Sequence, residues 1–311
     1  MNIKTRFTTA LAAATMLAGT TACAQQTLPS PVETTTVAAS EVELGGPALW
    51  KVADEDTTIY LFGTVHALPD DVDWNSGPVQ AALDSADVLV TEIDMNPETM
   101  SAMGALVAQK GMYPAGTTLR GQMNEEQRTR YEAALAKIGA PAAAFDQMEP
   151  WFATLALANQ AMAMAGFNPE NGVETVLEKT VKEGTQRAAL ETIEYQISIF
   201  DELPVDSQVD YLLETVEGFE EIEPMLAQLV DEWAAGDAEE LGALMNEAMS
   251  SDDVLTARLL TQRNAAWAEW IDTRLDSPGV VFMAVGAGHL AGDDSVQDML
   301  EARGIANTRV Q

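Results

Sequence analysis

Two spacings of apolar residues alternate along the chain, and together they predict an α/β protein. Short apolar runs between turn residues predict β-strands at 48–53, 57–63, 87–94, 186–190, 279–286 and 308–310. Apolar residues three and four positions apart predict helices at 78–85, 125–138, 150–165, 173–182, 222–234 and 254–275, and one that starts near Asp293. Strands at both ends, with mostly helical sequence over about 96–276 between them, predict one domain with a large helical insertion.

The first residues have the layout of a secretory signal peptide. Lys4 and Arg6 precede an apolar stretch at 10–19 that is too short to span a bilayer. The sequence LAGTTACA that follows resembles a bacterial lipobox, although Thr20 stands where an aliphatic residue is usual. We therefore predict a lipoprotein-type signal peptide over residues 1–22.

Cys23 is the only cysteine of the chain, so it cannot form an internal disulfide, and a lipid anchor explains its position. Ordinary cleavage after Ala24 is the alternative. Residues 23–46 contain Pro, Thr and Ser but no aromatic residue, which predicts a flexible tether before a folded body at 47–311. No other stretch reaches the roughly 18–20 apolar residues of a membrane helix. We expect an exported protein on the periplasmic face of the envelope, attached to the membrane only through the Cys23 lipid.

The charge excludes several classes of partner. The chain has 16 Lys and Arg against 49 Asp and Glu, a formal net charge of −33. Binding to nucleic acid or to an anionic membrane needs clustered basic residues, which are missing. Hydrophobic residues make up 47% of the chain, which excludes disorder throughout. The charge predicts a strongly solvated surface, with recruitment of cations as the alternative.

Both histidines of the chain follow a predicted strand, with a glycine three residues before each. His66 ends Gly-Thr-Val-His and His289 ends Gly-Ala-Gly-His. Since 21 of 311 residues are Gly, composition alone gives a probability of about 0.005 for both coincidences. A glycine lets the chain turn sharply off a strand, and open α/β sheets bind ligands at that edge. We therefore favour one shared site over two separate structural histidines.

Carboxylates end two of the predicted strands. Glu92 and Asp94 lie two residues apart at the end of one strand and should point to the same side of it. A carboxylate there must be hydrogen-bonded, paired or bound to a metal, and a structural salt bridge is the alternative to a functional role. Two imidazoles and a carboxylate suit Zn, Mn, Fe or Co. Glu191 follows the strand at 186–190 and could reach the same edge.

A basic residue interrupts the apolar face of the helix predicted at 254–275. Arg263 and Asn264 fall on the stripe formed by Leu260, Trp267, Ile271 and Leu275. A guanidinium facing the core needs an anionic partner. Arg263 is therefore either part of a structural ion pair or a group that binds a substrate carboxylate or stabilises an oxyanion.

Several of these segments together resemble the TraB/GumN family. They are LWKV (49–52), IYLFGTVH (59–66), VTEID (90–94), LETIEYQ (190–196), Arg263–Asn264 and VGAGHLAGD (285–293). The resemblance covers about 47–311. Relatives of this family include erythromycin-esterase-like proteins and ChaN-like haem-uptake proteins. The resemblance therefore implies the fold that these relatives share, a three-layer α/β/α domain with a mixed sheet.

The animal Tiki proteins, which are metal-dependent proteases, are also relatives. In them, paired Gly-x-x-His motifs, a Glu and an Arg build the site. The resemblance implies that His66, Glu92 and His289 bind a divalent Mn, Co or Zn ion and that Glu92 and Arg263 are catalytic. One glutamate cannot easily be both a full metal ligand and the general base, so these two roles of Glu92 are alternatives.

The combined prediction is a metal-dependent hydrolase of the cell envelope, with a peptidase acting on a peptide or protein substrate as the first choice. A non-catalytic protein that binds haem or a metal through the same histidines is the main alternative. An envelope scaffold whose histidines only pack in the core is the third.

Overall fold

The computed structural model describes residues 45–249 and 253–311. The signal peptide predicted at 1–22, the lipidation site Cys23 and the tether up to residue 44 lie outside the described residues, so those expectations stay predictions.

Six strands form one mixed sheet in the order β4-β3-β5-β2-β1-β6. Their bounds are β1 Leu49–Ala53, β2 Thr57–Thr64, β3 Val88–Thr91, β4 Gln186–Ala189, β5 Gly279–Gly286 and β6 Asn307–Arg309. The β1–β2 and β1–β6 pairs are antiparallel, whereas β2, β3, β4 and β5 run parallel to one another. The carboxyl ends of these four parallel strands therefore meet at one edge of the sheet, where ligands of open α/β sheets bind.

Every predicted strand is present, but the strand predicted at 87–94 ends at Thr91. The Thr91 hydroxyl donates to the Ile93 carbonyl at 2.7 Å, which fixes a local turn. Asp94 Oδ1 then accepts the Asn96 amide at 3.0 Å. The expectation that Asp94 ends the strand beside Glu92 is therefore wrong, because Asp94 belongs to the turn before the next helix.

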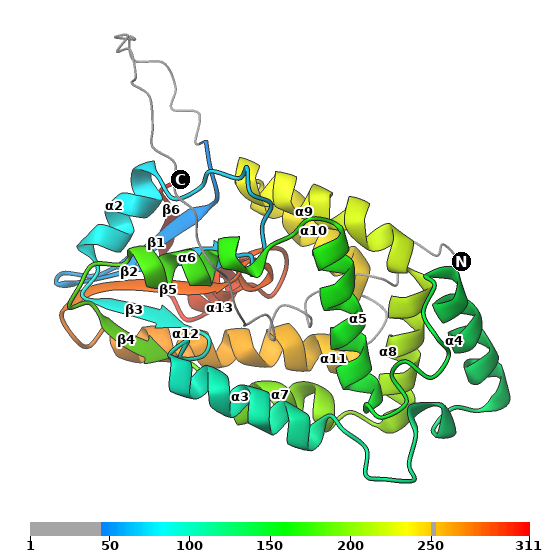
Figure 1. Cartoon of the computed structure of the whole chain (residues 1–311). Helices are drawn as coiled ribbons and strands as arrows, with labels where there is room; N and C mark the ends of the chain where they lie inside the picture. The colour runs from blue at the N-terminus through cyan, green and yellow to red at the C-terminus, as the bar shows by residue number, and fades with distance from the viewer. Residues whose placement is uncertain (1–44, 250–252) are drawn as a thin grey trace.

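Helices lie on both faces of the sheet and complete three layers (Figure 1). On one face, Phe62 and Phe282 pack against α2 (Gly77–Ser85), α6 (Val173–Thr180) and α9 (Ile222–Ala235). On the other, Leu61 and Met283 pack against α12 (Gln262–Arg274) and α13 (Val296–Ala302). The predicted three-layer α/β/α fold is confirmed.

Most of the remaining helices form the predicted insertion beside the sheet (Figure 1). They are α3 (Pro97–Lys110), α4 (Glu125–Lys137), α5 (Pro150–Met164), α7 (Ile193–Asp201), α8 (Val205–Glu217) and α11 (Asp253–Thr256). The exception is α10 (Ala238–Met249), which packs beside α9 through Leu241 in the core on the same face of the sheet. The insertion has cores of its own: Trp151 of α5 packs with α3 and α7, and Leu157 packs with α4 and α8.

The helix predicted at 254–275 is three helical pieces. A π-helix at Ala257–Thr261 separates α11 from α12, and the Gln262 amide bonds to the Ala257 carbonyl five residues back. Leu259 packs in the core of the insertion, whereas Trp267 packs on the sheet. The extra residue of a π turn rotates the helix between these two cores.

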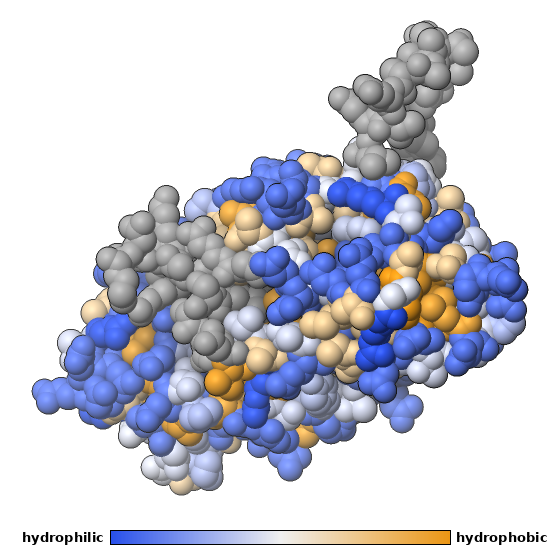
Figure 2. Space-filling model, turned by 180° about the vertical axis from the view of Figure 1, so that it is seen from behind, coloured by the Kyte–Doolittle hydropathy of each residue, from blue (hydrophilic) through white to orange (hydrophobic). Residues whose placement is uncertain are grey.

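No helix in the two described ranges is both long and apolar enough to cross a bilayer. The face seen in Figure 2 is mainly hydrophilic, with small, separate hydrophobic areas. This agrees with the solvated surface expected from the charge of −33.

Candidate functional site

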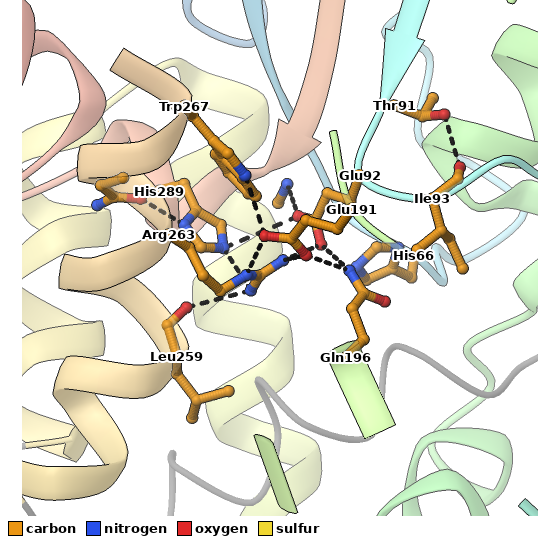
Figure 3. A network of polar contacts seen from close by, with 12 residues as sticks. His66, Thr91, Glu92, Ile93, Glu191, Gln196, Leu259, Arg263, Trp267 and His289 are labelled. Carbon is orange, nitrogen blue, oxygen red and sulfur yellow. Dashed lines mark hydrogen bonds and ion pairs between the residues drawn. The ribbon is translucent and has the colours of Figure 1, made fainter. Parts of the chain in front are cut away.

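A cluster of charged side chains lies at the carboxyl edge of the parallel strands (Figure 3). One follows each of the strands β2, β3 and β4, one lies in the 3-10 turn after β5, and the fifth comes from the start of α12. They are His66, Glu92, Glu191, His289 and Arg263. The structure thus brings all four predicted site residues, and Glu191 with them, to one edge of the sheet.

Arg263 is the centre of this cluster, and its side chain is 2% exposed. Nη2 donates to Glu92 at 2.6 Å and to Glu191 at 2.9 Å, and Nε donates to Glu191 at 2.8 Å. Nη1 donates to the Leu259 carbonyl at 3.1 Å and to Nε2 of His289 at 3.0 Å. Each of the five N–H groups therefore has an acceptor, which is the arrangement that a buried guanidinium requires.

The expected anionic partner of Arg263 is thus a pair of glutamates. Burial alone would lower the pKa of Arg263, but the charges of Glu92 and Glu191 outweigh it and raise the pKa above its usual value. Arg263 stays charged, and the two carboxylates beside it are neutralised in part.

Glu92 is held in its ionised form. Oε2 accepts from Arg263 and, at 3.0 Å, from Nε2 of Gln196, while Oε1 accepts the Gly286 amide at 2.8 Å. Burial acts to raise its pKa, but the positive charge of Arg263, followed by the two histidines, lowers it to about 2. Glu92 is therefore a fixed carboxylate at neutral pH.

Glu191 lies beside Glu92 and shares two donors with it. Arg263 Nη2 and the Gln196 amide each donate to both carboxylates. The Trp267 indole N–H donates to Oε1 of Glu191 at 3.0 Å. The ring of Trp267 also lies 4.2 Å from the His289 ring and 4.8 Å from the Arg263 guanidinium carbon. Trp267 thus packs three members of the cluster against one another.

His289 is a neutral imidazole with a defined tautomer. Its Nδ1 lies 2.6 Å from Asn264 Oδ1, and the Asn264 amide nitrogen donates to the Asp294 carbonyl at 2.8 Å. Because Nε2 accepts from Arg263, the ring proton is on Nδ1. Burial, followed by the charge of Arg263, lowers the pKa of His289 to about 3. Its Nε2 lies 3.8 Å from Oε1 of Glu92.

His66 has a carboxylate partner. Its Nδ1 lies 2.5 Å from Oε1 of Glu174, in the first turn of α6. Burial lowers the pKa of His66, but the charge and hydrogen bond of Glu174 outweigh it, and the pKa is raised. Electrostatic interactions with Glu92 and Arg263 also affect its pKa, which links His66 to the rest of the cluster.

The position of Glu174 depends on a close contact between α6 and the residues after β2. The Val173 amide donates to the Val65 carbonyl at 2.9 Å. A Cβ atom on Gly172 would lie 2.1 Å from the His66 carbonyl oxygen. Only glycine allows this approach, so Gly172 sets the distance between Glu174 and His66.

Sequence reasoning missed four polar contacts of the site. In the sequence, Trp267 stands out only as a member of a helix face, Gln196 only as part of a family segment, and Asn264 as both, with no polar role predicted for any of them. Glu174 was not singled out at all. The breakers in Pro169–Asn171 and Gly172 mark a helix start, but no local pattern distinguishes Glu174 from other acidic residues.

The residues present fit a divalent transition metal in their donor types. Both histidines have Nδ1 held by a side-chain acceptor, which leaves Nε2 as the ligating atom, and such acceptors are typical of metal-binding histidines. In the described ranges, no three His, Cys, Asp or Glu side chains already have the geometry of a metal site. The Arg263 guanidinium engages both Glu92 and His289. A metal ligated by His289 would therefore replace its hydrogen bond from Arg263.

The fold and the site define an α/β protein with a buried, charged centre at the carboxyl edge of a mixed sheet. The TraB/PrgY/gumN family matches residues 48–309, most of the chain, and the chain belongs to this family. No curated protein and no solved structure matches it.

Proposed function

We propose that the chain is a metal-dependent hydrolase that cleaves peptides, with His66, Glu92 and His289 as the metal ligands. The observation that carries the proposal is the shared arrangement of the two histidines. Glu174 holds Nδ1 of His66 and Asn264 holds Nδ1 of His289, so Nε2 is the nitrogen of each ring that would bind a metal. On His289 the metal would replace the hydrogen bond from Arg263. When bound, a divalent Mn, Co or Zn ion would supply Lewis acidity.

Glu92 and Arg263 have distinct tasks in this proposal. Glu92 is a carboxylate already freed of its proton, so it can bind a cation, whereas its low pKa makes it a weak base toward water. Arg263 fixes the orientation of Glu92 and Glu191. If Nε2 of His289 binds the metal, it no longer accepts the hydrogen bond from Nη1 of Arg263. That N–H could then donate to the carbonyl oxygen of a substrate, which is the oxyanion role expected from the sequence.

The proposal also includes where the protein is located and how it is attached to the membrane. The export signal at 1–22 and the lipid on Cys23 would hold the body at the periplasmic face of the envelope, where exported peptides and proteins would be its substrates.

Hydrolysis of a mixture of synthetic peptides tests the proposal. We expect cleavage after addition of Mn, Co or Zn, loss of cleavage on chelation, and loss in the variants His66→Ala and His289→Ala. Asp94→Asn is the matched control, because Asp94 lies in a turn outside the network. No cleavage with any of the three metals, together with a Soret band on haem addition that both His variants lose, would favour the haem-binding alternative and overturn the hydrolase.

A further inference from the structure

The sheet ends next to the site with a strand that no other described strand pairs with on its outer side. β4 is the terminal strand on that side, and all four of its residues are exposed. The Gln186 amide donates inward to the carbonyl of Asp87, just before β3, and the Leu190 amide donates to the carbonyl of Thr91, the last residue of β3. Since hydrogen bonding alternates along a strand, the backbone groups of Arg187 and Ala189 face outward, away from the sheet.

A cavity of about 250 Å³ opens where β4 ends. Its walls are mainly aromatic and aliphatic, and its polar lining is the outer side of the Arg263–Glu191 ion pair. The lining residues used here are Leu190, Glu191, Tyr195, Arg263, Trp267 and Trp270. Tyr195 is 41% exposed although it is aromatic. The cavity therefore connects the free strand edge with the charged cluster.

We propose that the substrate is an extended peptide that pairs with β4 as an added strand and places a large apolar side chain, aromatic in the first instance, in this cavity. The proposal rests on the proposed peptidase function and specifies its substrate. Backbone pairing at a free edge supplies affinity that is independent of sequence, and a side-chain pocket supplies the preference. Glu191 lines the cavity and shares donors with Glu92, so the bound side chain would lie next to the reacting centre.

The chemistry of the cavity favours an apolar over a cationic side chain. Both oxygens of Glu191 already accept hydrogen bonds, from Arg263, Trp267 and Gln196. A Lys or Arg side chain would have to displace these donors, and the Arg263 charge nearby would oppose it. A second copy of the chain is also disfavoured at this edge, because each copy carries a net charge of −33.

Amide NMR tests where a peptide binds, without any turnover. The probe is a short capped peptide of Ser and Thr with one central Phe, added to the metal-free His66→Ala/His289→Ala protein. We expect saturable shifts of the Arg187 and Ala189 amides, with smaller shifts for the inward-facing amides of Gln186 and Ala188. Two further peptides would be N-methylated on every second amide, one on the amides that face β4 and one on the amides that face away from it. The first should lose binding, and the second should keep it. Shifts that do not involve β4, or equal tolerance of both N-methylated peptides, would overturn the strand addition.

Two variants test the edge and the cavity separately. Ala189→Pro removes an outward N–H while the bonds from β4 to β3 remain, so it should abolish binding without changing the thermal midpoint. Tyr195→Ala should weaken binding of the Phe peptide about tenfold and leave an Ala-substituted peptide unaffected. Equal effects on both peptides would overturn the cavity assignment. Binding without hydrolysis by the wild type would reject only the peptidase function, whereas hydrolysis unaffected by Ala189→Pro would reject only the strand addition.

Discussion

Glu174 Oε1 lies 2.5 Å from Nδ1 of His66 and joins the first turn of α6 to the second residue after β2. Asn264 has the same relationship to Nδ1 of His289 at 2.6 Å. Two histidines from distant parts of the sequence are thus oriented in the same way by unlike acceptors. This pairing underlies the metal proposal, since an imidazole whose Nδ1 is held presents Nε2 to a ligand.

Replacement of Glu174 by Gln should reduce metal affinity about 10–100-fold, the usual cost of losing such a partner. The side chain keeps its size, but the charge that supports His66 is lost. A competition titration with a chromophoric chelator measures the affinity. Glu170→Gln is the control, because Glu170 pairs with Lys179 on the surface. Equal affinities for the two variants would show that Glu174 does not support a ligand.

Gly172→Ala should destabilise the fold by about 1–3 kcal/mol, the range typical of overpacking. The added Cβ would meet the His66 carbonyl oxygen at 2.1 Å, so α6 must move away from β2. Chemical denaturation measures the free energy of unfolding. Gly104→Ala in α3 is the control, because no atom outside its helix lies within 4 Å of the added Cβ, and it should be neutral or stabilising. A neutral Gly172→Ala would contradict the close contact.

Arg263→Met should reduce the free energy of unfolding by about 3–5 kcal/mol, because Glu92 and Glu191 would remain buried side by side without their cation. Arg303→Met is the matched surface control. Arg303 pairs with Asp272 where both side chains are more exposed, and such pairs contribute about 0–1 kcal/mol. Urea unfolding compares the two variants. Similar losses would mean that the buried network contributes little to stability.

The helical insertion should lose stability in acid through Asp146. Hydrogen bonds from Arg120 outweigh partial burial and lower the pKa of Asp146 below its ordinary value of 3.8. A carboxylate whose pKa is lower in the folded state than in the unfolded state stabilises the fold when the pH is above the unfolded-state pKa. This contribution disappears as the pH falls through the folded-state pKa. The difference in unfolding free energy between wild type and Asp146→Asn should therefore be largest near pH 7 and vanish in strong acid. A difference independent of pH, measured by urea unfolding, would contradict the ion pair.

Local patterns in the sequence predict the strands, the bounds of α2, α4, α5, α6 and α9, and the placement of both histidines. They give no bounds for α3, α7, α8 and α10, which fall in the stretch predicted only as mostly helical. Each Gly-x-x-His motif follows its own strand, so no distant contact is needed to find it. The burial of Arg263 follows from its position on an apolar helix face. Its partners cannot be chosen from 49 acidic residues by pattern alone, because the choice depends on which strand ends lie across from α12.

Contacts that depend on packing between distant elements could not be predicted. Glu174 meets His66 only because α6 approaches the end of β2 at Gly172. The π-helix before α12 lies between Leu259, which packs in the core of the insertion, and Trp267, which packs on the sheet. Asp94 lies outside the strand because the Thr91 hydroxyl bonds to the Ile93 carbonyl, and apolar periodicity does not reveal such a side-chain hydrogen bond.

Elemental analysis of the purified protein tests the metal proposal most directly. Wild type and the His66→Ala/His289→Ala variant would be compared after exposure to Mn, Co and Zn, with folding checked by circular dichroism. The account predicts a near-stoichiometric metal in the wild type and its loss in the folded double variant. A wild type without metal after all three additions, or a double variant that retains the same amount, would contradict it.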